Sequence, residues 1–205
     1  MRKYIVNDIF YTLQGEGNWS GRAAVFVRFS RCNLWSGREE DRATALCNFC
    51  DTDFLNGEKY SLEDLVSEIF RAWPYPAHRP MVVFTGGEPL LQLDEPLIKK
   101  IKDLGFYIAV ETNGTVLPPA GIDWLCVSPK ILTRTVVHWA DELKLVYPQS
   151  TLSPEDFQGF TALFKWLSPM DGPNYEENLA KTIKYVQADP VWRLNIQTHK
   201  FIGVK

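Results

Sequence analysis

The sequence lacks any apolar run of about 18 residues, the length that a membrane-spanning helix needs. It also lacks a basic excess: 22 Lys and Arg stand against 25 Asp and Glu, and the net charge of −3 is not typical of a nucleic-acid-binding surface. Residues 1–8 turn polar too early for a secretory signal. We therefore expect a cytoplasmic protein that binds neither a membrane nor a nucleic acid.

Cysteine is scarce, with four residues in a chain of 205, yet three of the four lie within nineteen positions. In a reducing compartment such clustering indicates metal binding or catalysis before disulfides. The remaining composition is that of an ordinary globular protein, with 45% hydrophobic residues. We expect one domain over residues 1–205, since two much smaller domains would be hard to stabilise.

Seven short apolar runs predict buried strands. Most of them lack strict alternation of apolar and polar residues, which favours parallel strands covered on both faces. The runs are Ala24–Phe29, Met81–Phe84, Tyr107–Val110, Trp124–Val127, Leu143–Tyr147, Ala162–Leu167 and Trp192–Ile196.

Helical patterns alternate with several of these runs. One follows a capping Ser61, a second covers about residues 94–104, and a third covers about residues 175–188. Only thirteen residues separate Val110 from Trp124, which leaves little room for a helix. The order predicts an α/β fold, either a βα barrel or an open sheet, with abbreviated crossovers.

Chemically distinctive segments follow the first four runs. They are Cys32, then Thr85–Pro89, then Glu111–Gly114, then Ser128–Lys130. Because sites in such folds lie at the carboxyl ends of the strands, we expect these segments to meet in one place.

The three clustered cysteines, Cys32, Cys47 and Cys50, have the spacing C-x14-C-x2-C. Thiolates are ligands for zinc or for the iron of an iron–sulfur cluster. A structural zinc site needs a fourth ligand, for which the candidates are His78, His138 and His199. A cluster with one open iron needs only three thiolates, and the cysteines alone leave both readings open. Cys126 lies inside an apolar run and is expected to be a core residue.

The segment Thr85-Gly86-Gly87-Glu88-Pro89 is compatible with a tight turn or with a binding site. Its two glycines let the backbone approach a ligand closely, and Glu88 adds a carboxylate. It matches neither a Walker loop nor the dinucleotide-binding fingerprint.

Together, three cysteines after the first strand and a GGEP segment after the second resemble the radical S-adenosylmethionine superfamily. Most members space the cysteines C-x3-C-x2-C, and this chain inserts eleven residues in the first gap, at about 33–46. That spacing resembles the 7-carboxy-7-deazaguanine synthase (QueE) family. Further matching segments lie at residues 9–17, 33–37, 49–53, 111–114, 128–130, 169–172 and 197–200.

The resemblance implies a trimmed, partial (βα) barrel of the radical S-adenosylmethionine type. It implies a lyase that converts 6-carboxy-5,6,7,8-tetrahydropterin to 7-carboxy-7-deazaguanine and ammonia, on the way to queuosine and other 7-deazapurines. The implied cofactors are a 4Fe–4S cluster, S-adenosylmethionine and Mg²⁺, and the implied partners are an electron donor such as flavodoxin or ferredoxin and a second copy of the chain. The alternatives are another radical enzyme, such as a glycyl-radical activase, and a non-enzymatic zinc-binding module.

The resemblance also assigns residues. Cys32, Cys47 and Cys50 would hold the cluster, and Thr52 would bind magnesium. The implied cofactor-lining residues are Phe49, Cys50, Asp51, Gly87, Ser128, Pro129, Lys130, Ser168, Pro169, Met170 and Asp171. The implied substrate-binding residues are Leu13, Gln14, Gly15, Arg28, Thr85 and, through its terminal carboxylate, Lys205.

Some of these residues stand out without the resemblance. Arg28 lies in an otherwise apolar strand, where a guanidinium is costly unless an internal acid or a substrate carboxylate pairs with it. Thr52, between Asp51 and Asp53, offers an oxygen to magnesium or caps a turn. Glu111 ends a strand that faces the expected cavity, but the sequence assigns it no catalytic role.

Overall fold

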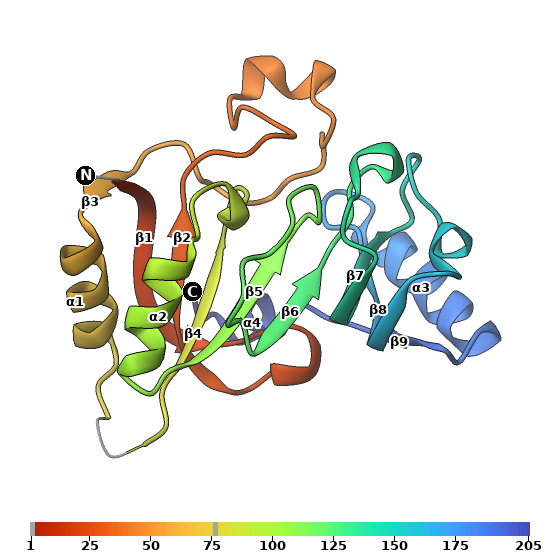
Figure 1. The fold of residues 1–205 in the computed structure, drawn as a ribbon. Helices are drawn as coiled ribbons and strands as arrows, with labels where there is room; N and C mark the ends of the chain where they lie inside the picture. Colours follow the sequence, from red (N-terminus) through yellow and green to blue (C-terminus); the bar gives the residue numbers. More distant parts are fainter. Residues whose placement is uncertain (1–2, 76–77) are drawn as a thin grey trace.

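The computed structural model describes residues 3–75 and 78–205, so the first two residues of the polar N-terminal stretch lie outside it. Within these residues one sheet has the order β3-β1-β2-β4-β5-β6-β7-β8-β9 (Figure 1). The strands are β1 (Tyr4–Leu13), β2 (Ala23–Phe29), β3 (Glu58–Tyr60), β4 (Met81–Gly86), β5 (Tyr107–Thr112), β6 (Trp124–Val127), β7 (Trp139–Tyr147), β8 (Thr161–Pro169) and β9 (Trp192–Leu194).

The seven predicted strands are confirmed as β2 and β4 to β9, and each pairs in parallel with its neighbour in the sheet. The sequence reading missed β1 and β3, which add two antiparallel strands at one edge. Asn7 and Asp8 interrupt the apolar pattern of β1, and the ladder with β2 shifts register between Val6 and Asp8. A bulge of this kind hides a strand from a search for periodicity.

The helices are α1 (Leu62–Ala72), α2 (Glu95–Asp103), α3 (Tyr175–Ala188) and α4 (Thr198–Ile202). The first three were predicted, and α1 begins as expected because the Ser61 hydroxyl accepts a hydrogen bond from the Asp64 amide. No periodic pattern predicts α4, which is a single short turn of helix.

The sheet does not close on itself, because β3 and β9 are opposite edges of the order. The connections β5–β6, β6–β7 and β7–β8 contain no α-helix, which confirms the abbreviated crossovers and the partial barrel. In Figure 1, α1 and α2 lie on one side of the sheet, and the orange segment after β2 stands above the strand ends. None of the described helices is long and apolar enough to cross a bilayer.

The two faces of the sheet are packed differently. One face forms the large core with α1 and α2. The other face carries a smaller buried cluster of Ala24, Phe26, Met81, Val83 and Ala109. Because side chains alternate along a strand, the next residues on this second face are two positions further toward the carboxyl ends, where the cavity opens.

Candidate active site

One cavity of about 340 Å³ lies at the carboxyl ends of the parallel strands. Its lining contains every residue that the resemblance assigned, with the exception of Pro129. Pro129 is buried between Ser128 and Lys130, which do line the cavity. The fold therefore brings segments from residue 13 to residue 205 to a single place.

The three clustered cysteines all line this cavity as free thiols. Burial raises the pKa of each thiol, that of Cys47 to about 11, and the neighbouring sulfurs Cys32 and Cys50 add to the rise. Among the described residues no three His, Cys, Asp or Glu side chains converge closely enough to hold a single metal ion. Of the candidate zinc-completing histidines, His199 lines the cavity and His78 and His138 do not.

The glycine-rich segment is locked to the segment that leads to Cys32. The Gly87 amide donates to the Phe29 carbonyl at 3.0 Å and the Glu88 amide to the Arg31 carbonyl at 2.8 Å. A Cβ on Gly87 would lie 2.0 Å from the Arg31 oxygen, so only glycine permits this approach. The first cysteine and the GGE segment are therefore placed together by the backbone.

Glu88 is fully buried, and its hydrogen bonds go to the protein itself. One carboxylate oxygen accepts from the Leu90 amide and the Thr112 hydroxyl, and the other accepts from the Asn113 amide at 2.8 Å. Burial raises the pKa of this carboxyl. Since Glu88 does not line the cavity, it fixes the ends of β4 and β5 and leaves the glycines to face the cavity.

The inserted segment is folded over the second and third cysteines. It contains a 3-10 turn, Glu39–Thr44, which carries Arg42. The Arg42 guanidinium donates to the carbonyls of Asn48 at 3.0 Å and Cys50 at 3.1 Å and lies over the Trp35 ring. The insertion thus holds the turn between Cys47 and Cys50.

A row of polar side chains crosses the cavity floor. Arg28 on β2 is opposite Thr85 on β4. Phe84 of β4 is opposite Val110 of β5, so the residues that follow them, Thr85 and Glu111, are also neighbours. Arg28, Thr85 and Glu111 therefore lie side by side just beyond the apolar cluster of the same face, and all three line the cavity. In the described parts of the chain no acidic side chain pairs with Arg28, whose guanidinium lies 5.8 Å from the Phe10 ring centre.

A buried lysine completes the other side of the floor. The ammonium of Lys144 on β7 pairs with the Glu16 carboxylate and lies 3.7 Å from the Glu111 carboxylate. Gln14 donates to Glu111 at 2.8 Å, and Gln197 donates to Glu16 at 2.8 Å. The sequence reading missed Lys144, although a lysine inside the apolar run Leu143–Tyr147 is the same kind of signal as Arg28.

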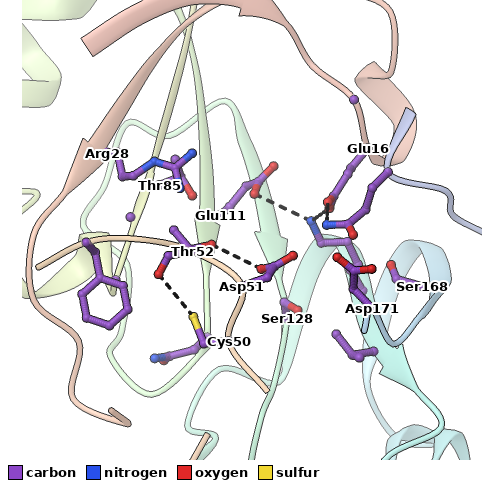
Figure 2. Close-up of a pocket in the computed structure, with 18 of the residues that line it drawn as sticks. Glu16, Arg28, Cys50, Asp51, Thr52, Thr85, Glu111, Ser128, Ser168 and Asp171 are labelled. Carbon is purple, nitrogen blue, oxygen red and sulfur yellow. Dashed lines mark hydrogen bonds and ion pairs between the residues drawn. The ribbon is translucent and has the colours of Figure 1, made fainter. Parts of the chain in front are cut away.

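Lys200 of α4 joins two cavity walls that are distant in sequence. Its ammonium pairs with Asp51, at 2.7 Å, and with Asp171 after β8. Burial would raise the pKa of Asp51, but the Lys200 ion pair outweighs it and the pKa is lowered. Thr52, next in the chain, donates weakly to Asp51 at 3.4 Å and also faces the cavity (Figure 2).

The last residues close one side of the cavity. The Thr198 amide donates to the Gly15 carbonyl at 2.9 Å, and a Cβ on Gly15 would lie 2.1 Å from the His199 ring. Lys205 pairs with Asp8, and its main-chain oxygen accepts from the Thr12 hydroxyl at 2.9 Å. The C-terminal segment is thereby fastened to the first strand and the turn that follows it.

Two further walls come from the ends of β6 and β8. Lys130 donates to the Ser128 hydroxyl at 2.7 Å and lies 5.9 Å from the Phe49 ring centre. The Ser168 hydroxyl accepts from the side-chain amide of Asn195 at 2.8 Å. Cys126 is buried in β6, away from the other thiols in sequence, as expected for a core residue.

Comparison with known proteins gives close relatives over the whole chain, although no family model matches it. The 7-carboxy-7-deazaguanine synthase of Caulobacter vibrioides is 50% identical over 98% of this chain and 99% of its own. That of Bordetella pertussis is 51% identical with the same coverage. The chain belongs to the 7-carboxy-7-deazaguanine synthase family. The crystal structure of QueE from Escherichia coli superposes with a TM-score of 0.71 at 26% identity, covering 96% of this chain and 95% of that one.

Membership of the deazaguanine synthase family makes this a radical S-adenosylmethionine enzyme and implies an iron–sulfur cluster. The donor set fits that group, because three thiols line one cavity and three is the number that leaves one iron open to the cofactor. The relatives carry this family's name and not that of a glycyl-radical activase, so the activase alternative loses its support.

Proposed function

We propose that this protein converts 6-carboxy-5,6,7,8-tetrahydropterin to 7-carboxy-7-deazaguanine with release of ammonia, a step in 7-deazapurine biosynthesis. The observation that carries the proposal is the common cavity: the three free thiols and the polar row Arg28, Thr85 and Glu111 line the same space. One part of the cavity then serves the radical cofactor and the other serves the substrate.

The polar row supports a substrate with unlike ends. Arg28, which has no acidic partner among the residues that the structure describes, offers a guanidinium that can bind a carboxylate with two hydrogen bonds. Glu111 stands two strands away, about 10 Å at the usual strand spacing, and offers a carboxylate that accepts N–H donors. A 6-carboxypterin carries its carboxylate at one end and its amino-pyrimidine N–H edge at the other.

The cofactor half of the cavity rests on the cysteines. We propose that Cys32, Cys47 and Cys50 hold a 4Fe–4S cluster, which together with S-adenosylmethionine supplies, when bound, the radical chemistry that removes a substrate hydrogen. The walls proposed for S-adenosylmethionine are lining residues beside Cys50 and at the strand ends. They are Phe49, Asp51, Gly87, Ser128, Lys130, Ser168, Pro169, Met170 and Asp171, with Pro129 supporting its two neighbours from behind.

The magnesium site is proposed at Thr52. Its hydroxyl faces the cavity and is held only by a long hydrogen bond to Asp51. Asp51 itself is engaged by Lys200, so Thr52 is the proposed oxygen ligand of this segment. Magnesium retains several waters and takes substrate oxygens, so one protein oxygen can suffice.

Three parts of the proposal concern the enzyme as a whole. We propose a single core domain over residues 1–205 with a cluster-binding insertion at about 33–46. We propose a cytoplasmic homodimer that receives electrons from a flavodoxin or ferredoxin. We propose that Leu13, Gln14, Gly15 and Lys205 contact the substrate, and their place in the cavity lining supports this.

The experiment is anaerobic turnover of the reconstituted enzyme. Iron and sulfide are added, and the cluster should absorb at about 400 nm and be bleached by dithionite. The reduced enzyme is then incubated with S-adenosylmethionine, Mg²⁺ and the carboxytetrahydropterin, and 7-carboxy-7-deazaguanine is sought by mass spectrometry. Cofactor cleavage without this product would overturn the substrate assignment, and binding of zinc without iron or sulfide would overturn the cluster.

A further inference from the structure

Lys144 is a buried cation on the floor of the substrate half of the cavity. Its side chain is 10% exposed, and the Glu16 and Glu111 side chains that it contacts are 14% and 24% exposed. Lys144 projects from the middle of β7, where burial of an unpaired ammonium would be strongly unfavourable. The two carboxylates therefore account for the presence of the ammonium in this place.

The surrounding charges come from every element packed around Lys144. Glu16 lies in the turn after β1, Glu111 on β5, Glu142 on β7 and His199 on α4. Glu142 accepts hydrogen bonds from the Trp124 indole and the Asn18 amide, so it is satisfied separately. The thiol of Cys126 on β6 is buried close to the ammonium.

The amides of the site orient the two carboxylates from the other side. Gln14 donates to Glu111 and accepts from the Glu16 amide, while Gln197 donates to Glu16. Each carboxylate is thus held by Lys144 on one side and by a glutamine on the other. Both also face the cavity and keep lone pairs for a ligand.

We propose that Lys144 is a positioning residue that keeps Glu16 ionised and holds Glu16 and Glu111 in place as hydrogen-bond acceptors for the N–H edge of the substrate. This rests on the proposed function, since the pterin supplies that edge. The lysine acts through the carboxylates and takes no part in the radical step.

The reason is the direction of the hydrogen bond: the carboxyl group must accept it, because the pterin edge donates it. Burial alone favours the protonated form of Glu16, so without the ammonium its carboxyl group takes up a proton more readily. A protonated carboxyl group presents an O–H donor to the N–H donors of the pterin edge, and recognition is lost. At higher pH this proton leaves and Glu16 is an acceptor again.

The test measures equilibrium binding of the carboxytetrahydropterin to the anaerobically reconstituted enzyme, without turnover, between about pH 6.5 and pH 8.5. Lys144→Met should weaken binding relative to wild type by about 10- to 100-fold at the low end, the range for a lost hydrogen bond to a charged group. The loss should shrink several-fold at the high end. Lys144→Arg, which keeps the charge, should recover most of the affinity.

Lys165→Met is the matched control. Lys165 lies on the neighbouring strand β8, faces the other side of the sheet and donates to the Phe157 carbonyl. The Lys165→Met variant should bind the carboxytetrahydropterin with the affinity of the wild type. If Lys144→Met does not fold, Lys144→Gln removes the charge while keeping a donor, and the same pH profile is expected.

The outcomes separate the two levels of the proposal. A wild-type enzyme that neither binds nor converts the carboxytetrahydropterin overturns the proposed function. If the wild type binds and converts it, two results overturn the role of Lys144: unchanged binding in Lys144→Met, or a loss that is the same at both ends of the pH range, as a merely structural lysine would give.

Discussion

At the scale of single residues, the site depends on charged side chains that project from otherwise apolar strands. Arg28 on β2 and Lys144 on β7 both lie on the cavity floor. Lys144 is neutralised by carboxylates of the protein, whereas in the described chain no acidic group pairs with Arg28. The cavity therefore offers a subsite for an anion at the Arg28 end and hydrogen-bond acceptors, the carboxylates beside Lys144, at the other end.

Replacing Arg28 by Met should remove the anion subsite. We expect binding of the carboxytetrahydropterin to weaken by about 10- to 100-fold, because a charged hydrogen-bonded pair is lost. Binding of tetrahydropterin, which has no carboxylate, should change by less than about 3-fold. Titration calorimetry with both ligands measures this, and an equal loss for both would show that Arg28 does not bind the carboxylate.

Glu16 should make the stability of the fold depend on acid pH. Burial alone would raise its pKa, but the charge and hydrogen bond of Lys144 outweigh burial, and the pKa is lowered. A carboxyl whose pKa is lower in the folded state stabilises the fold above the unfolded pKa, about 4.3, and that contribution is lost as the pH falls through the folded pKa.

Glu16→Gln should therefore unfold more easily than wild type at neutral pH, by about 1–3 kcal/mol. The difference should shrink as the pH falls from about 4.3 through the lowered folded-state pKa, because Glu16 then takes up a proton in the folded state too. Urea unfolding of the two proteins at a series of pH values checks this. A difference that stays constant from pH 7 to pH 3 would rule out the ion pair as its source.

At the scale of elements, the helix α1 tests the local basis of the fold. Ser61 caps it by accepting from the Asp64 amide at 3.1 Å. Ser61→Ala should lower the free energy of unfolding by about 1 kcal/mol. Ser67→Ala, an exposed position within the same helix, should leave it equal or slightly raised, because alanine is the better helix former. Equal losses in the two variants would exclude capping as the cause.

The inserted segment, at about 33–46, should slow the loss of the bound cluster. Arg42 holds the carbonyls of Asn48 and Cys50, on either side of the turn. We expect Arg42→Ala to lose iron to a chelator several-fold faster than wild type, while Arg38→Ala, on the exposed side of the same segment, loses it at the wild-type rate. Equal rates of iron release in all three proteins would contradict this role of Arg42. The measurement is the release of iron from anaerobically reconstituted protein.

Much of the fold could be predicted because its parallel strands are buried on both faces and read as continuous apolar runs. β1 was hidden because Asn7 and Asp8 break its pattern at a bulge, and β3 has only three residues. The three cysteines and Arg28 could be found because they contrast with their surroundings. Lys144 carries the same contrast, but its role depends on Glu16 and Glu111, which only the folded sheet brings to it.

At the scale of the whole molecule, the open sheet leaves room that the C-terminal segment fills. Gln197, Thr198 and Lys200 connect this segment to Glu16, Gly15 and two aspartates of the cavity walls. Figure 1 shows α4 and the C-terminus on the side of the sheet opposite α1 and α2. The cavity is thus bounded by strand ends, by the cysteine segment and by the last residues of the described chain.

The most direct measurement quantifies ammonium and 7-carboxy-7-deazaguanine together in one anaerobic turnover of the carboxytetrahydropterin. The proposed ring contraction predicts one ammonium for each deazaguanine, with both products abolished in Cys50→Ala and retained in Cys126→Ala. Consumption of S-adenosylmethionine by the wild-type enzyme with neither product formed, or deazaguanine formed without ammonium, would contradict it.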